Sequence, residues 1–222
     1  MVCDDGDVIL PGGFMPAAER FGLIHAVDRW IVARAIRQLT QLREQGKEVC
    51  FSINLSAKAF EDHTLLPMIQ AQLADTGLDA SWLTFEITET AAIANLGAAE
   101  RFIGELKTIG CQFALDDFGS GFSSFSYLKH LPVDKLKIDG SFVQNMASAE
   151  VDQAMVQSMN QVAHALGKAT IAEYVESDEI LQLLQQYGVD YAQGNFIGRP
   201  NESLINLAVT RPIYSNVTQL KT

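Results

Sequence analysis

The sequence predicts an α/β protein whose strands form a parallel sheet or a barrel. A unit of amphipathic helix, glycine and short apolar strand recurs along the 222-residue chain, and strands that alternate with helices are typical of this fold class. Polar side chains follow the strands at their carboxyl ends, where barrels and open α/β sheets place their chemistry. Six strands are visible, whereas a closed (βα)8 barrel needs eight.

The first half of the chain predicts a loop, three helices and two strands. Apolar residues three or four positions apart mark the buried face of each helix, and glycines follow the helices where they end. The expected elements are a loop over 1–11, helices at Met15–Phe21, onward to about Gln45 and around Leu66–Leu73, and strands at Val49–Leu55 and Leu83–Thr88.

The second half continues the same alternation. Gly110, Gly167 and Gly188 end its three main helices, and Ser177 can cap the last of them. The expected elements are helices around Phe102–Ile109, Val151–Leu166 and Ile180–Leu184, and strands at Phe113–Leu115, Lys135–Asp139, Thr170–Glu173 and Tyr191–Gln193.

The stretch Gln112–Asp139 is central to the predicted site. Its first strand ends in Asp116 and Asp117, and Gly119 lets the backbone turn directly afterwards. Neighbouring side chains on a strand point to opposite faces, so both carboxylates can serve one site only where the strand is ending. The alternative is a solvated turn or a helix N-cap, because aspartate is common in turns.

The other strands are also followed by polar residues. These residues are Asn54, Glu86 with Glu89, Lys137, Glu173 with Glu176, and Gln193. Six strand ends that converge on one barrel mouth would make a site. Oxygen ligands of this kind suit Mg²⁺ or Mn²⁺ rather than zinc, and two such ions could share a carboxylate and clamp a phosphodiester.

The run DDFGSGFSSFSYLKHLPVDKLKID, residues 116–139, resembles the signature of the EAL domain family. The resemblance continues through SINLS, FEITET, IAEYVES and DYAQGNFIGRP. It implies a TIM-like, modified (βα)8 barrel that hydrolyses the bacterial messenger cyclic di-GMP to linear pGpG, uses two Mg²⁺ or Mn²⁺ ions and forms a homodimer. We accordingly divide the chain into an entry loop (1–13), a barrel (14–200) and a C-terminal helix or tail (201–222).

The resemblance also implies which residues bind metal. The ligands would be Asn54, Glu86 and Asp116 for the first ion, Asp116 and Asp117 for the second, and Gln193 in support. Near the last strand, Phe196 and Pro200 could stack on guanine or simply pack at the barrel rim.

Two further residues resemble the family's catalytic groups. Lys137 would orient the nucleophilic water and offset phosphate charge, and Glu173 would be the general base. We therefore expect Lys137 to matter for catalysis and little for folding. Glu89 resembles the glutamate that anchors the loop Phe118–Phe125, which shapes the second metal site and the dimer contact. For Glu89 and Glu176 we favour a hydrogen bond that fixes a loop.

The chain departs from the family pattern in two places. Tyr174 stands where the family usually has glycine, which adds bulk beside Glu173 but removes no ligand. The Glu-Ala-Leu segment, with a ligand of the first metal, and the strand before it have no counterpart in the sequence. We therefore expect an N-terminally truncated barrel with unpaired edges near Val49 and Tyr191, and reduced activity. The alternative function is an inactive receptor or regulatory module that binds cyclic di-GMP.

Composition and charge limit the classes of binding partner and the cellular compartment that we expect. A net charge of -11 argues against a duplex-DNA binder, which needs a basic stripe. The three cysteines are odd in number and far apart, as in a cytoplasmic chain with reduced thiols. The start MVCDDGDV lacks the features of a signal peptide, and no apolar run is long enough to span a bilayer. We expect the chain to be part of a larger multidomain signalling protein.

Overall fold

The computed structural model describes residues 8–121 and 125–200, together with the backbone of two strands at 213–214 and 217–219. These residues form one eight-stranded sheet in the order β1-β2-β3-β4-β5-β6-β8-β7. The first six strands run parallel to one another and confirm the six predicted strands. They are β1 (Phe51–Asn54), β2 (Leu83–Thr88), β3 (Gln112–Phe118), β4 (Lys135–Ile138), β5 (Ala169–Ala172) and β6 (Tyr191–Gln193).

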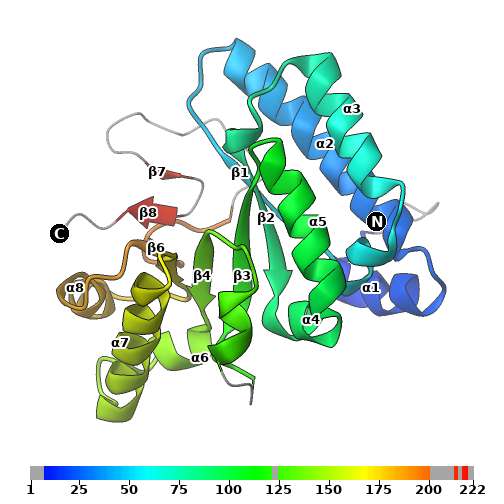
Figure 1. Cartoon of the computed structure of the whole chain (residues 1–222). Coiled ribbons are helices and arrows are strands. Elements are labelled where there is room, and N and C mark those ends of the chain that lie inside the picture. The colour runs from blue at the N-terminus through cyan, green and yellow to red at the C-terminus, as the bar shows by residue number, and fades with distance from the viewer. Residues whose placement is uncertain (1–7, 122–124, 201–212, 215–216, 220–222) are drawn as a thin grey trace.

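The sheet curves into half of a barrel, and helices lie around its outer side (Figure 1). Short 3-10 turns at Ala57–Glu61, Ala80–Trp82 and Phe125–Lys129 complete the connections. No helix in the described ranges is long and apolar enough to cross a membrane. The helices are α1 (Pro11–Arg20), α2 (Ile24–Glu44), α3 (Leu65–Thr76), α4 (Glu89–Ala94), α5 (Leu96–Thr108), α6 (Gly140–Val143), α7 (Glu150–Ala165) and α8 (Asp178–Gln186).

Two helical segments differ from the sequence-based expectation. Pro11 opens α1, so residues 11–13 are helical rather than part of an entry loop over 1–13. Proline is favoured at this position because the first helical N–H has no partner in any case. The short helix α4 was not predicted. It begins directly after β2, where the hydroxyl of Thr88 accepts a hydrogen bond from the N–H of Ala91.

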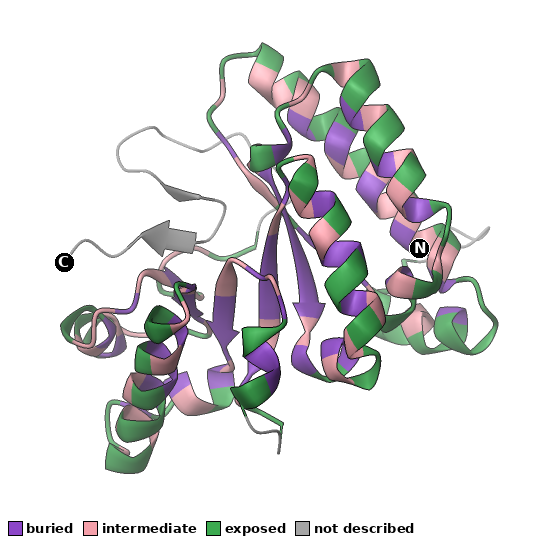
Figure 2. Ribbon diagram, viewed as in Figure 1, coloured by how far each residue is buried: buried purple, intermediate pink, exposed green. Residues whose placement is uncertain are grey.

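The main core lies between the sheet and the helices on its outer side (Figure 2). Phe85 on β2 and Phe113 on β3 are fully buried, with ring centroids 5.6 Å apart. The inward faces of α2 and α5 cover them with aliphatic side chains such as Ile36 and Leu106. The apolar spacing thus correctly predicted helices that bury one face, although the most buried residues of α2 are Ile24, Val32, Ile36 and Leu39.

The edge of the sheet at β6 differs from the prediction, which left it unpaired. The described part of the expected C-terminal helix or tail (201–222) forms two short strands, β7 (Ile213–Tyr214) and β8 (Val217–Gln219). The rest of that segment lies outside the described residues. Strand β8 pairs antiparallel with β6, with Tyr191 opposite Gln219. The edge near Tyr191 is thus paired, and β1 is the parallel strand left at an end of the sheet.

We expect the β1 edge to promote self-association of the 222-residue chain, because an unpaired strand offers its backbone groups to another chain. Ser52 on this strand is exposed. Ser52→Lys should shift the population toward monomer, since an edge lysine must be desolvated on pairing. Sedimentation velocity over a range of concentrations would measure this. Ser158→Lys, on the exposed side of α7, adds the same charge elsewhere, and an equal effect of the two changes would contradict the prediction.

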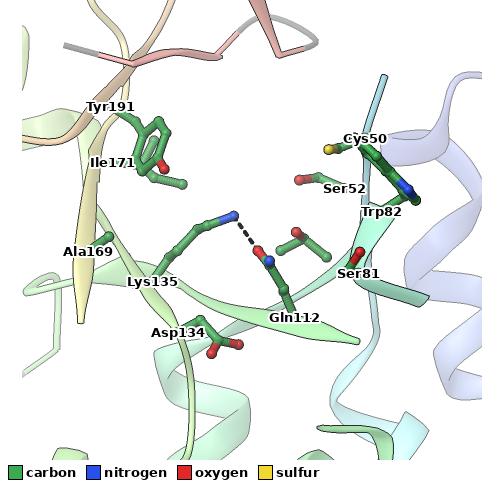
Figure 3. A pocket seen from close by; sticks show the side chains of 11 residues that line it. Cys50, Ser52, Ser81, Trp82, Gln112, Asp134, Lys135, Ala169, Ile171 and Tyr191 are labelled. Carbon is green, nitrogen blue, oxygen red and sulfur yellow. Dashed lines mark hydrogen bonds between the residues drawn. The ribbon is translucent and has the colours of Figure 1, made fainter. Parts of the chain in front are cut away.

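The inner side of the half-barrel is hollow near the amino ends of the strands. A cavity of about 450 Å³ opens there, with Lys135 reaching across it to Gln112 at 2.8 Å (Figure 3). Burial lowers the pKa of Lys135. Cys50 lines this cavity and is half-buried, whereas Cys111 is buried in the core.

Candidate active site

The predicted site residues lie at or near the carboxyl ends of the six parallel strands. The positions are Asn54 on β1, Glu86 on β2, Asp116 and Asp117 on β3, Lys137 on β4, Glu173 directly after β5, and Gln193 on β6. Strand register places Asn54 beside Glu86 and Thr88 beside Asp116. The parallel sheet therefore gathers residues from six separate segments at one end of the half-barrel.

Lys137 lies at the centre of this cluster. Its Nζ contacts Glu86 Oε2 at 2.7 Å, Asp116 Oδ1 at 2.8 Å and Glu173 Oε1 at 2.9 Å. The side chain is almost fully buried, with 4% exposed. A buried ammonium is stable only when it is paired, and three carboxylates provide that pairing. Lys137 is thus built into the folded structure, which differs from the expectation that it matters little for folding.

The pKa values of the cluster follow from burial and from this pairing. Burial acts to lower the pKa of Lys137, but Glu86, Glu173 and Asp116 outweigh it and raise that pKa, so the lysine stays charged. Burial raises the pKa of Glu173 to about 7, against a partial offset from Lys137. Burial and the neighbouring Asp116 also raise the pKa of Asp117. The site thus contains one fixed cation and a carboxyl group that titrates near neutrality.

This pKa of Glu173 predicts a pH dependence of stability for the metal-free chain. Between pH 4.5, the ordinary pKa of a glutamate, and about pH 7, the folded form holds a proton that the unfolded chain releases. The contribution of Glu173 to stability therefore falls as pH rises across this window. Urea unfolding in EDTA at both ends of this pH window should show a smaller fall in the free energy of unfolding for Glu173→Gln than for the wild type. An identical pH dependence of the two proteins would contradict it.

Both aspartates at the end of β3 lie at the site, but the geometry of the strand differs from the prediction. The strand does not stop at Asp116 but continues to Phe118. Its register with β4 shifts between Leu115 and Phe118, and Asp117 has a φ of 56°. Such a bulge changes the alternation of side chains. The pair therefore belongs to an irregular strand rather than to a solvated turn or a helix N-cap.

The carboxylates at this end can hold a metal ion. One oxygen each from Asp116, Asp117 and Glu173 lies within 4.8 Å of the others. Three carboxylates at this spacing match the hard oxygen ligands that divalent cations such as Mg²⁺ and Mn²⁺ prefer. The donor set therefore fits the metal that the sequence implied.

The two glutamates assigned to loop fixing differ. Glu89 is buried at the start of α4, and its Oε2 accepts a hydrogen bond from the N–H of Gly119 at 3.0 Å. A Cβ at Gly121 would also lie 3.4 Å from Glu89 Oε1, so the loop after β3 runs close over this carboxylate. Glu176 is exposed and forms no hydrogen bond or ion pair with the described part of the chain, so the expected bond is not found there.

A glycine positions the end of β6. A Cβ at Gly194 would lie 2.3 Å from the backbone N and O of Val175, so only glycine lets these two segments meet. The N–H of Val175 donates to the carbonyl oxygen of Gln193 at 3.0 Å. This contact fixes Gln193 beside the segment that follows Glu173.

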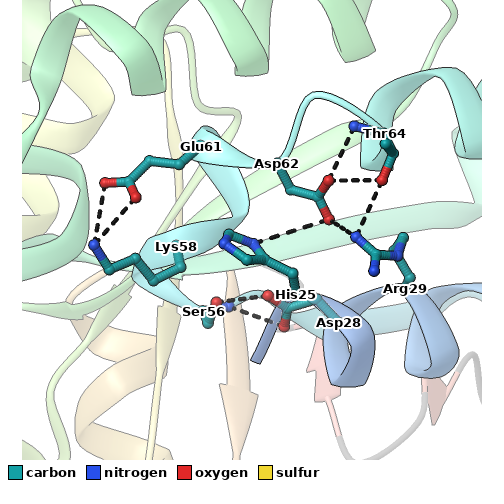
Figure 4. Close-up of polar contacts among 8 residues, drawn as sticks. All are labelled: His25, Asp28, Arg29, Ser56, Lys58, Glu61, Asp62 and Thr64. Atoms are coloured by element: carbon teal, nitrogen blue, oxygen red, sulfur yellow. Dashed lines mark hydrogen bonds and ion pairs between the residues drawn. The ribbon is translucent and has the colours of Figure 1, made fainter. Parts of the chain in front are cut away.

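A buried contact that was not predicted joins α2 to the segment that follows β1 (Figure 4). Asp28 on α2 accepts two hydrogen bonds from Ser56, one from its hydroxyl at 2.5 Å and one from its N–H at 3.3 Å. Burial raises the pKa of Asp28. Asp28 lies on the apolar stripe of α2 between Ile24 and Val32. An acidic residue on a buried stripe was the available signal, because a buried carboxyl needs a partner.

The fold and the site together define an α/β-barrel domain with a lysine-centred acidic site at the carboxyl ends of its strands. The EAL domain family model matches residues 1–200. The chain therefore belongs to the EAL domain family, as the sequence motifs indicated.

Named relatives agree with this assignment. The chain is 41% identical over 195 residues to the cyclic di-GMP phosphodiesterase PdeB of Shewanella oneidensis, covering 88% of this chain and 23% of that protein. It is 34% identical over 210 residues to the cyclic di-GMP phosphodiesterase PdeF of Escherichia coli, covering 95% and 28%. The chain thus spans about a quarter of the length of these relatives.

Solved structures support the same fold. The FimX EAL domain of Pseudomonas aeruginosa bound to c-di-GMP matches with a TM-score of 0.85 and 31% identity, over 91% of this chain and 81% of that one. The PaMucR phosphodiesterase in complex with c-di-GMP matches with a TM-score of 0.82 and 33% identity, over 89% and 81%.

Proposed function

We propose that the chain is a metal-dependent phosphodiesterase domain that opens cyclic di-GMP to linear pGpG. The observation that supports this most directly is the contact of Lys137 with carboxylates from three separate segments, Glu86, Asp116 and Glu173, two of which belong to the candidate metal cluster. The relatives PdeB and PdeF, which are cyclic di-GMP phosphodiesterases, support the substrate.

We further propose that two Mg²⁺ or Mn²⁺ ions bind here, held by the residues that the family resemblance implies. These are Asn54, Glu86, Asp116 and Asp117, with Gln193 in support. Bound cations of this kind neutralise phosphate charge and lower the pKa of water. They would also offset the acidic character of a chain with net charge -11, which otherwise repels an anionic ligand.

The chain's own residues would then position and deprotonate the attacking water. Lys137 is fixed by its three partners, so its N–H groups can hold a water and stabilise charge that develops on the phosphate without reorganising. Glu173 lies 2.9 Å from Lys137. With a pKa raised to about 7 in the metal-free protein, it is suited to accept the proton of the water, because a general base works best near the operating pH.

The test is hydrolysis of cyclic di-GMP with product analysis by mass spectrometry. Linear pGpG should form in Mg²⁺ or Mn²⁺ and stop in EDTA. The competing function is an inactive receptor or regulatory module. Metal-independent binding of cyclic di-GMP, seen as thermal stabilisation, without any turnover in either metal would favour that module over the enzyme.

The metal site makes a separate prediction for thermal stability. The carboxylates of Asp116 and Asp117 repel each other when no cation is bound, and a divalent cation that binds only the folded form raises stability. Wild type should gain melting temperature on moving from EDTA to millimolar Mg²⁺ or Mn²⁺, and Asp116→Asn should gain much less. Asp178→Asn, at the exposed start of α8, is the matched control. An equal response of Asp116→Asn and wild type would remove Asp116 from the ligand set.

The proposal extends to the compartment, the oligomeric state and the domain context of the chain. We propose a cytoplasmic domain that acts as a homodimer within a larger multidomain signalling protein. The partial coverage of PdeB and PdeF supports a multidomain context, and the homodimer follows from the family resemblance, in which the residue matched by Glu89 anchors the loop at the dimer contact, here by accepting a hydrogen bond from the N–H of Gly119.

A further inference from the structure

Tyr174 follows Glu173 in a backbone conformation that normally belongs to glycine. Its φ is 55°, in the left-handed region where residues with a Cβ are strained. The residue is 55% exposed. The residue therefore strains the backbone at the edge of the site and leaves a large aromatic surface in contact with water.

The ring rests on a glycine of a neighbouring helix. A Cβ at Gly140, the first residue of α6, would lie 2.1 Å from Cδ2 of Tyr174 and within 3 Å of two more ring atoms. All three nearest atoms belong to Tyr174. Gly140 therefore leaves the space that the ring occupies, and the Cδ2 side of the ring is held against the protein.

The same ring forms a wall of a small hollow beside the proposed base. The hollow has a volume of about 250 Å³ and is lined by Glu173, Tyr174, Gln193, Gly194, Asn195 and Pro200. Pockets for whole drug-sized ligands measure roughly 300–1,000 Å³, so this one suits part of a ligand. It combines an aromatic face with the amides of Gln193 and Asn195, which can both donate and accept hydrogen bonds.

We propose that Tyr174 is a ligand-binding residue whose ring stacks on one purine base of the cyclic dinucleotide, an inference that rests on the proposed function. A flat base fits a fixed aromatic face, and stacking of a base on such a ring contributes substantially to binding of nucleotides. A glycine at this position would remove the backbone strain and the exposed ring together. A bound base instead covers the ring, and it stands next to Glu173, where the phosphodiester must lie.

Direct binding of cyclic di-GMP, measured by calorimetry in EDTA so that no turnover intervenes, tests this. Tyr174→Gly should weaken the affinity about tenfold, the effect of losing one stacked base, while its melting temperature stays equal or rises because the strain is gone. Tyr174→Phe keeps the ring and should bind like wild type. Loss of affinity together with equal or higher stability is a combination that a merely structural role would not produce.

Gly140 provides a second test that leaves Tyr174 in place. Gly140→Ala should displace the ring and weaken binding to a similar extent as Tyr174→Gly. In the Tyr174→Gly background the same change should have little further effect on affinity, because the clashing atoms are absent. Additive losses in the double variant would show that Gly140 and Tyr174 act separately and would overturn the assignment.

The possible failures are distinguishable. If folded wild type binds no cyclic di-GMP, both the proposed function and this inference fail. If wild type binds and Tyr174→Gly binds equally well, only the inference fails. Tighter binding by Tyr174→Gly would show that the ring obstructs the site instead of contacting the base.

Discussion

Replacing Lys137 with alanine is expected to lower the free energy of unfolding of the metal-free chain by about 3–5 kcal/mol, the usual cost of removing one partner from a buried ion pair. The change leaves carboxylates from Glu86, Asp116 and Glu173 close together with no cation between them. For a domain of this size the melting temperature should fall on the order of 10 °C. Urea unfolding in EDTA measures the change directly.

A surface ion pair provides the matched control. Lys107 pairs with Asp134, and both side chains are 32% exposed. Lys107→Ala should therefore cost about 0–1 kcal/mol. Millimolar Mg²⁺ should restore part of the stability of Lys137→Ala, because a bound cation offsets the same carboxylates, and should do nothing specific for Lys107→Ala. Equal small losses in the two variants would mean that the buried cluster is not held by its lysine.

Replacing Glu173 with glutamine is expected to reduce turnover of cyclic di-GMP by about 10²- to 10⁴-fold, the range for loss of a positioned general base. Glutamine keeps the size of the side chain and an oxygen that can accept a hydrogen bond from Lys137, so folding should persist. In wild type, kcat should rise with pH as Glu173 loses its proton. Bound cations lower the pKa of this carboxyl, so the rise should fall at or below about pH 7.

Glu176→Gln is the control for Glu173→Gln, because Glu176 lies three residues further on and is exposed. It should leave turnover and pH dependence close to wild type. A pH–rate profile for Glu173→Gln that keeps its ascending limb would identify another group as the base. Near-normal turnover by a folded Glu173→Gln protein would exclude Glu173 from proton transfer altogether.

The sequence predicted the repeated elements well because their signals are local. Apolar spacing on α2 and α7, and the glycines after the helices, depend on neighbours within a few residues. The polar residues at the ends of β1–β6 were also correctly placed at one end of the sheet, since parallel strands leave little choice.

Other features depend on contacts between distant segments and left no clear local signal. The bulge that turns Asp117 into the site arises from the register of β3 against β4. The pairing of β8 with β6 joins segments for which a helix or tail was expected. The structural role of Lys137 depends on the positions of three other segments of the chain. An isolated sequence position cannot reveal how many partners the fold will bring to it.

The three carboxylate contacts of Lys137 also bear on the order in which the domain matures. An acidic cluster that depended on metal for its charge balance would fold only as fast as metal was supplied, as zinc fingers do. Here an ammonium group from β4 already balances part of that charge. The polypeptide can therefore fold first and bind metal ions afterwards. When metal is scarce, the domain would remain folded but inactive, and it would not become a substrate for proteases.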